Sequence, residues 1–548
     1  MNRPALNELS LTEKIAQLLM LDEQKIKYKL VDGEQQIRSQ AEIDEFMQRC
    51  QFGSYWCCGC VNVETGKTMS VKEHKASIDS FQKHVRLPML VAIDAENGLT
   101  IPGGTQIPSP LSIGAANDEE TIEKLYNGVA KELRAAGINW RWCPVVDLVG
   151  RLTSSVCRIF SDDPERVTRV CTAALRGEEA GKTATTVKHF PGGSGISITA
   201  DSHFSITRLL STYEDWKAKQ GKIFQNMIDA GVMTIMVGHK AFMAVDDTLI
   251  NGNPTPSTLS SKVIQGLLRD EMGFKGVVIS DDISMAGMTR ICNSREDMLI
   301  RAINAGNDIL LGVYPEDFDL IYAAVCDRRI PMERIEESCE RVLELKEKIG
   351  LFDGAQDEEI DLEAANRQVT EASRIIAEKS VTLLYDKENL LPVSKEKIKS
   401  VSIIYASHYA GTKWQLEVMK EEFEKRGAAV TLTNGFPTGG ITAAAQTDLI
   451  IYVGYIAMHQ PAGLPSLYDS QLTFFNQAFT KGREKSIGVS VGYPYLHIDA
   501  MGGANTFVNL YSPAPEVIKA FVKGVYGEIP FVGTSPVDIE PKIRQIYC

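Results

Sequence analysis

The stretch Gly276-Val277-Val278-Ile279-Ser280-Asp281 is an apolar run of strand length that ends in a carboxylate. Three other apolar runs end in an ionisable side chain in the same way, at Asp94, His189 and His239. Buried strands of parallel sheets read as apolar runs, and the active sites of (β/α)8 barrels lie where such strands end. The sequence therefore predicts an α/β fold with an N-terminal (β/α)8 TIM-type barrel. The apolar runs that support it are 87–94, 138–144, 183–189, 233–239, 276–281 and 308–311.

The segments between these runs are suited to crossover helices, and a second series of runs follows further along the chain. Helices are expected over 117–133 and 261–271, each with its apolar residues on one stripe. A stretch of linker composition at 350–359 precedes a long helical segment at 362–379. The later apolar runs then predict a smaller αβ sandwich, doubly wound and flavodoxin-like. These runs are 400–405, 448–453 and 486–491.

The predicted organisation has three parts. A TIM-barrel catalytic domain occupies residues 1–350, a linker and connecting helix occupy 351–385, and a C-terminal α/β sandwich domain occupies 386–548. The candidate catalytic residues Asp201, His203 and Asp281 all fall within the first part.

Composition and charge narrow the class of protein. Of the 548 residues, 44% are hydrophobic and 24% are charged, which is typical of a globular protein. Lys and Arg number 58 against 71 Asp and Glu, so the formal net charge is −13 and nucleic-acid binding is disfavoured. The first residues do not have the pattern of a signal peptide, no apolar run is long enough to span a membrane, and the 11 irregularly spaced cysteines suit reduced thiols. We therefore expect a cytoplasmic protein with no membrane or nucleic-acid partner.

The densest group of polar side chains runs from Lys188 to His203, where a strand end leads through a glycine-rich loop to Asp201 and His203. An aspartate beside a histidine fixes the tautomer of the ring and raises its pKa, which suits a general acid/base. An ordinary surface loop is the alternative. Asp281 at its strand end can be a nucleophile or bind a hydroxyl, or it can cap the next helix. Asp94 can hold a sugar diol or belong to a turn.

Together these segments resemble the signatures of family 3 glycoside hydrolases, specifically the β-N-acetylglucosaminidase branch. Lys188-His189-Phe190-Pro191-Gly192 followed by Asp201-Ser202-His203 is similar to the loop signature of that branch. The stretch 258–285 is similar almost throughout, and the matching motifs keep the family's order from residue 10 to residue 350. Segments 390–393 and 482–536 are similar to the C-terminal domain of two-domain members. The other matching segments are 94–98, 143–147 and 158–164.

The resemblance implies a retaining exo-glycosidase. Asp281 would attack the anomeric carbon, and His203, oriented by Asp201, would protonate the leaving oxygen and later activate water. The resemblance implies neither a metal nor an organic cofactor. The expected substrate is a small oligosaccharide or glycoside with terminal β-linked N-acetylglucosamine, from peptidoglycan fragments being recycled or from chitooligosaccharides. The positions that would grip the sugar or line the pocket are Asp94, Arg158, Lys188, His189 and His239.

Three alternative functions stay open, and departures from the family pattern bear on the first of them. Gly193 stands where the pattern has histidine, and the interval from Lys188 to Asp201 is two residues longer. A non-catalytic carbohydrate-binding sensor would follow if the longer loop no longer delivers His203. A phosphorylase is the second alternative, because a neutral histidine repels phosphate less than a carboxylate does. A β-glucosidase of the same fold is the third, although that branch takes its acid/base from elsewhere.

The cysteine cluster near residue 58 has no assigned function, and the oligomeric state stays open. Cys57, Cys58 and Cys60 are interpreted as packed free thiols, because a structural zinc site usually has a second pair of ligands at a defined spacing. The sequence does not distinguish a monomer from a homodimer.

Overall fold

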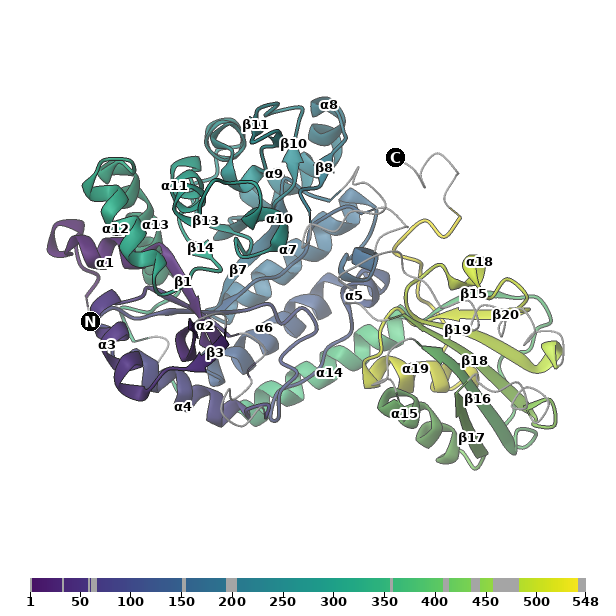
Figure 1. Ribbon diagram of the computed structural model, residues 1–548. Helices are drawn as coiled ribbons and strands as arrows, with labels where there is room; N and C mark the ends of the chain where they lie inside the picture. The colour runs from purple at the N-terminus through teal and green to yellow at the C-terminus, as the bar shows by residue number, and fades with distance from the viewer. Residues whose placement is uncertain are drawn as a thin grey trace. The chain divides into compact units, whose positions relative to one another are not determined.

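The computed structural model describes residues 2–31, 34–57, 60, 67–149, 154–193, 205–354, 358–407, 413–434, 444–456 and 482–540 (Figure 1). The chain forms two compact units that do not follow the chain order. The first unit comprises residues 1–105, 123–147 and 171–369, and the second comprises 106–122, 148–170 and 370–548. The domain boundaries expected from the sequence stay a prediction.

The first unit contains an eight-stranded sheet in which every pair of neighbouring strands is parallel. Its two end strands, β13 and β14, are joined by a parallel bridge between Ile279 and Ile309, which brings the sheet round into a barrel. The expected TIM-type barrel is thereby confirmed. In spatial order the strands are β1 (Leu19–Asp22), β4 (Ser54–Trp56), β5 (Leu90–Ile93), β6 (Trp140–Arg141), β7 (Ala184–Phe190), β9 (Thr234–Val237), β13 (Val277–Ser280) and β14 (Leu310–Leu311).

Helices separate the barrel strands along the chain, and their ends follow local sequence signals. Ser39 and Ser70 each cap a helix, and a glutamate three residues later completes a capping box. The two expected barrel helices are present as α6 (Glu119–Ala135) and η5 (Lys262–Glu271), the latter wound with wide, π-type turns. The other principal helices before, between and after the barrel strands are α1 (Leu11–Gln17), α3 (Gln40–Cys50), α4 (Val71–Gln82), α7 (Pro164–Ala180), α9 (Lys222–Asp229), α11 (Arg295–Ala305), α12 (Asp317–Cys326) and α13 (Met332–Lys348).

Smaller elements decorate the barrel. A hairpin of β2 (Tyr28–Val31) and β3 (Glu34–Ile37) follows β1. Strand β8 (Arg208–Leu209) pairs with β10 (Ala241–Phe242), and β11 (Leu249–Ile250) pairs with β12 (Asn253–Pro254). The short helix α10 (Ala286–Thr289) follows β13.

The second unit contains a six-stranded sheet in the order β15-β20-β19-β18-β16-β17. Five of its strands are parallel, and β15 pairs antiparallel with β20. Leaving β15 aside, the parallel strands have the flavodoxin-like order 2-1-3-4-5, so this part of the fold prediction is also confirmed. The strands are β15 (Thr382–Asp386), β16 (Ser400–Ser407), β17 (Ala429–Asn434), β18 (Leu449–Ile456), β19 (Ser486–Gly492) and β20 (Thr506–Asn509).

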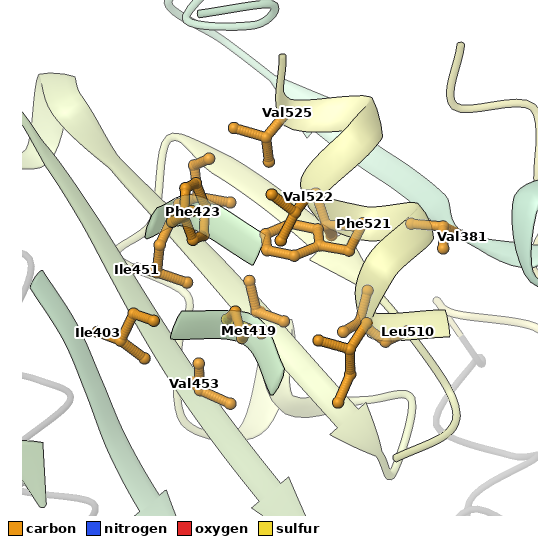
Figure 2. Packing of buried hydrophobic residues seen from close by; sticks show 14 of the residues in the cluster. Val381, Ile403, Met419, Phe423, Ile451, Val453, Leu510, Phe521, Val522 and Val525 are labelled. Carbon is orange, nitrogen blue, oxygen red and sulfur yellow. The ribbon is translucent and has the colours of Figure 1, made fainter. Parts of the chain in front are cut away.

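Each face of this sheet has its own apolar core. Figure 2 shows one core, in which Met419 and Phe423 of α15 (Lys413–Glu424) and Phe521 of α19 (Pro515–Val525) pack against Ile451 and neighbouring strand residues. The other core lies under α5 (Pro110–Ala116), η2 (Ser154–Arg158) and α18 (Leu496–Asp499). The long helix expected at 362–379 is α14 (Leu362–Ser380), which continues from the first unit into the second. In the part of the chain that the structure describes, we find no helix both long and apolar enough to cross a membrane.

Candidate active site

Asp281 is delivered by the barrel, directly after β13. Its backbone N–H donates to Val237 O (2.9 Å), which extends the pairing with β9. Burial acts to raise the pKa of its carboxyl, but nearby His189, the backbone N–H of Asp282 and the Lys188 ammonium more than offset burial, so the pKa lies below the usual value. The carboxyl is therefore ionised at neutral pH, as an attacking nucleophile requires.

The neighbouring Asp282 stabilises the turn that follows β13. Its Oδ1 accepts from the backbone N–H of Ser284 (2.7 Å) and from the Ser284 hydroxyl (2.6 Å). Its own N–H donates to Asp281 Oδ1 at 2.8 Å. Asp282 thus caps the turn after β13, and its N–H orients the Asp281 carboxylate.

Lys188 links two carboxylates at the end of β5. Its ammonium lies 2.6 Å from Asp94 Oδ1 and 3.0 Å from Glu96 Oε1. The Lys188 side chain is only 1% exposed, whereas that of Asp94 is 47% exposed. Lys188 therefore holds Asp94 in place while leaving much of its carboxylate accessible, which is the arrangement that hydrogen bonding to a sugar diol needs.

Arg141 fixes the backbone next to Asp94. It is fully buried on β6 and donates from Nε (3.1 Å) and Nη2 (2.7 Å) to the carbonyl of Ala95, a residue with φ of 43°. Its third contact is an ion pair with buried Glu178, and its guanidinium lies 4.7 Å from the centre of the Tyr126 ring. Arg141 was not among the predicted site residues, because an arginine inside a strand gives no hint of the carbonyl it will meet.

His189 is oriented by Asp147. The Asp147 carboxylate accepts from the His189 backbone N–H and from its Nδ1, both at 2.9 Å, so Nδ1 carries a proton and Nε2 is left on the other side of the ring. Lys240 lies 3.9 Å from the same carboxylate. Burial acts to raise the pKa of Asp147, but Lys240 and His189 lower it well below the usual value. Asp147 and Lys240 were not among the predicted site residues, since only the fold brings them to His189.

His239 uses both ring nitrogens within the protein. Nε2 lies 2.9 Å from the carbonyl of Asp282, which can only accept, so Nε2 carries the proton. Nδ1 lies 2.8 Å from the Thr258 hydroxyl. Burial lowers the pKa of this ring, so His239 is neutral at neutral pH. His239 is thus built to position the Asp281–Asp282 turn.

The predicted acid/base pair, Asp201 and His203, lies outside the described residues, but the chain on either side of that segment is anchored. Before it, Trp216 Nε1 donates to Pro191 O (2.7 Å) and Lys240 Nζ to Gly192 O (2.9 Å). After it, the backbone of Ser205 packs closely on Gly287, six residues beyond the predicted nucleophile.

Arg158 belongs to the second compact unit, at the end of η2. It is thus not among the side chains that the barrel itself gathers, and its role in sugar binding stays a prediction. Among the described residues, no group of three or more His, Cys, Asp or Glu side chains is placed to hold a metal ion.

The geometry brings an ionised carboxylate, a held aspartate and an oriented imidazole to the carboxyl ends of alternate barrel strands, β13, β5 and β7. The family model for the glycosyl hydrolase family 3 N-terminal domain matches residues 10–345. The chain belongs to glycosyl hydrolase family 3. It is accordingly a glycoside hydrolase, as the motifs predicted.

Curated relatives and solved structures extend this likeness. A β-N-acetylglucosaminidase/β-glucosidase of Cellulomonas fimi is 27% identical over 501 residues, covering 86% of this chain and 87% of the relative. A β-hexosaminidase of Methylobacillus flagellatus is 30% identical over 247 residues, or 43% of this chain and 68% of the relative. A family 3 β-N-acetylglucosaminidase from a Paenibacillus species superposes with a TM-score of 0.80 at 25% identity, covering 98% of this chain and all of that one. A β-glucoside phosphorylase superposes with a TM-score of 0.78 at 25% identity, covering 97% and 94%.

Proposed function

We propose that this chain is a retaining exo-β-N-acetylhexosaminidase that removes terminal β-linked N-acetylglucosamine. The observation that carries the proposal is Asp281, an ionised carboxylate at the end of a barrel strand beside His189 and the Lys188–Asp94 pair. The names of the Cellulomonas, Methylobacillus and Paenibacillus relatives support this choice of sugar. Peptidoglycan fragments and chitooligosaccharides are the substrates that present such a terminal sugar.

The proposed reaction has two displacement steps. A carboxylate oxygen of Asp281 bonds to the anomeric carbon as the bond from that carbon to the leaving oxygen breaks, and the leaving oxygen takes a proton from His203. Water then attacks the same carbon, His203 takes a proton from the water, and the bond to Asp281 breaks. Asp94 and Lys188 hold the hydroxyls of the sugar during both steps. The parts given to His203 and Asp201 rest on the sequence motif alone.

The test is hydrolysis of 4-nitrophenyl N-acetyl-β-D-glucosaminide by the wild-type chain and two variants. Asp281→Asn removes the nucleophile and is expected to lower kcat by about 1,000-fold or more. Asp270→Asn changes an exposed carboxylate on η5 and is expected to leave kcat unchanged. An inactive wild-type chain, or an Asp281→Asn variant with full turnover, would contradict the proposal.

Phosphorolysis is the second candidate, because a β-glucoside phosphorylase shares the fold over 97% of this chain. The described lysines of the site favour water as the acceptor. Lys188 already contacts two carboxylates, and Lys240 contacts Gly192 O and lies near Asp147. We therefore expect the same products and rates with and without phosphate. Release of a sugar 1-phosphate would reverse this assignment.

Assays with a pair of aryl substrates distinguish specificity for N-acetylglucosamine from specificity for glucose. The Cellulomonas relative is named for both N-acetylglucosaminide and glucoside hydrolysis, so the aryl β-glucoside is the informative comparison. We expect a higher kcat/KM for the N-acetylglucosaminide. Binding of N-acetylglucosamine without turnover of either substrate would instead indicate a carbohydrate sensor.

A further inference from the structure

Trp56 is the last residue of β4, on the inner side of the barrel. It pairs in register with Ala92 of β5, and it packs against the core cluster that contains Ala92, Trp140 and Trp142. Its neighbour Tyr55 instead meets Phe81 of α4, on the helix side (ring centres 5.2 Å apart). Alternate residues of a strand face opposite ways, so Trp56 faces the interior, at the end of the barrel where the site lies.

Three tryptophans fill the space beneath the site. Trp140 Nε1 donates to Thr186 Oγ1 (2.7 Å) deep in the barrel, and the Trp142 ring stands edge-on to Trp140 with ring centres 6.1 Å apart. The Trp56 ring lies against Trp142, with ring centres 5.7 Å apart and planes tilted by 37°. Trp140 and Trp142 are buried, whereas Trp56 is only partly buried. Trp56 is therefore the member of this stack that keeps exposed surface.

The polar groups of the site lie directly above this stack. The ion pair between Lys188 of β7 and Asp94 after β5 spans the intervening strand β6, so it passes over the end of β6, where Trp142 stands. Side chains in such barrels form layers drawn from alternate strands. Trp56 ends β4 and Trp142 directly follows β6, whereas Asp94 directly follows β5 and Lys188 lies on β7. The aromatic layer thus lies one step below the charged layer.

We propose that the Trp56 indole is the apolar platform of the sugar-binding pocket. A pyranose ring held through its hydroxyls by Asp94 and Lys188 turns a face of C–H groups toward whatever lies beneath, and an aromatic side chain offers a large, rigid apolar surface there. The proposal rests on the proposed function only in that the pocket above Asp94 holds a sugar. The C–H face is common to glucose and N-acetylglucosamine, so the platform serves both.

Two substitutions separate aromatic stacking from mere packing. Trp56→Phe keeps an aromatic ring. It removes no described hydrogen bond, because Trp56 Nε1 is buried and has no partner among the described residues. Trp56→Leu keeps an apolar side chain but removes the ring. We expect Trp56→Phe to retain the wild-type KM for both aryl substrates within about threefold. We expect Trp56→Leu to raise KM about tenfold for both, with a smaller change in kcat.

Intrinsic fluorescence provides a readout that does not require turnover. N-acetylglucosamine binding is expected to change the emission of the wild-type chain and of Trp414→Phe, which removes a 48% exposed tryptophan of the second unit. The change should be largely lost in Trp56→Phe. Equal KM values for Trp56→Leu and Trp56→Phe, or an undiminished emission change in Trp56→Phe, would overturn the platform. Failure of the proposed hydrolysis would appear in the wild-type chain itself, so the two failures are distinguishable.

Discussion

Replacing Asp147 by asparagine tests how far His189 depends on its carboxylate. Asp147 accepts two hydrogen bonds from His189, both at 2.9 Å, inside a buried environment. The introduced amide either presents its NH2 group to the Nδ1 proton or forces the ring into the other tautomer. Hydrogen bonds to charged groups contribute about 1.5–3 kcal/mol each, and tenfold in rate corresponds to about 1.4 kcal/mol. Loss of the bond to Nδ1 should therefore lower kcat/KM by about 10- to 100-fold.

The assay compares kcat/KM and the melting temperature of wild type and Asp147→Asn from pH 5 to 8. The pKa of Asp147 lies well below its usual value in the folded chain. Any stability from its ionised form is thus present above the unfolded pKa of about 3.9 and is lost only as pH falls through the lower folded value. The loss in kcat/KM should therefore be constant across this pH range. A kcat/KM within twofold of wild type would refute the role assigned to Asp147.

Three further changes probe the frame around the site. Arg141→Met leaves Glu178 buried without its partner, so we expect the free energy of unfolding to fall by about 3–5 kcal/mol. Denaturant titration measures this loss, and an unfolding midpoint equal to that of wild type would contradict the prediction. Gly287→Ala places a methyl group 3.0–3.2 Å from the backbone of Ser205, so we expect kcat to fall several-fold while the melting temperature stays unchanged. A variant with full activity would show that the contact between Ser205 and Gly287 does not affect catalysis. Burial lowers the pKa of Lys346 to about 7, so this group binds more protons in the unfolded chain between pH 7 and 10 and its contribution to stability rises with pH there. The slope of unfolding free energy against pH should therefore be smaller in Lys346→Met than in wild type, and equal slopes would contradict this.

The sequence predicted most of the barrel but missed two of its strands. Strand β1 lies directly after the helix α1, where Leu18 to Leu21 reads equally well as another helical turn. Strand β4 has only three residues, which is too short for a periodic signal. In both places the partner strands decide the conformation, because β1 and β4 pair with each other and with β14 and β5.

The site was predictable to the extent that its residues stand at strand ends. Asp94, Lys188 and Asp281 gather at the ends of alternate strands β5, β7 and β13, as expected of a parallel barrel. The residues that orient them were missed, because a buried arginine on β6 or a lysine after β9 gains its meaning only from a partner distant in sequence. Arg141 meets a carbonyl 46 positions away, and Lys240 meets one 48 positions away. No periodicity or local motif records such pairs.

Trapping the glycosyl-enzyme intermediate tests most directly whether Asp281 is the nucleophile. Incubation with an activated 5-fluoro N-acetylglucosaminyl fluoride, followed by proteolysis and mass spectrometry, identifies the residue that becomes glycosylated. We expect one added sugar on the peptide that contains Asp281, and no label in Asp281→Asn. Turnover of the aryl substrate with no covalent label, or a label on another residue, would contradict this expectation.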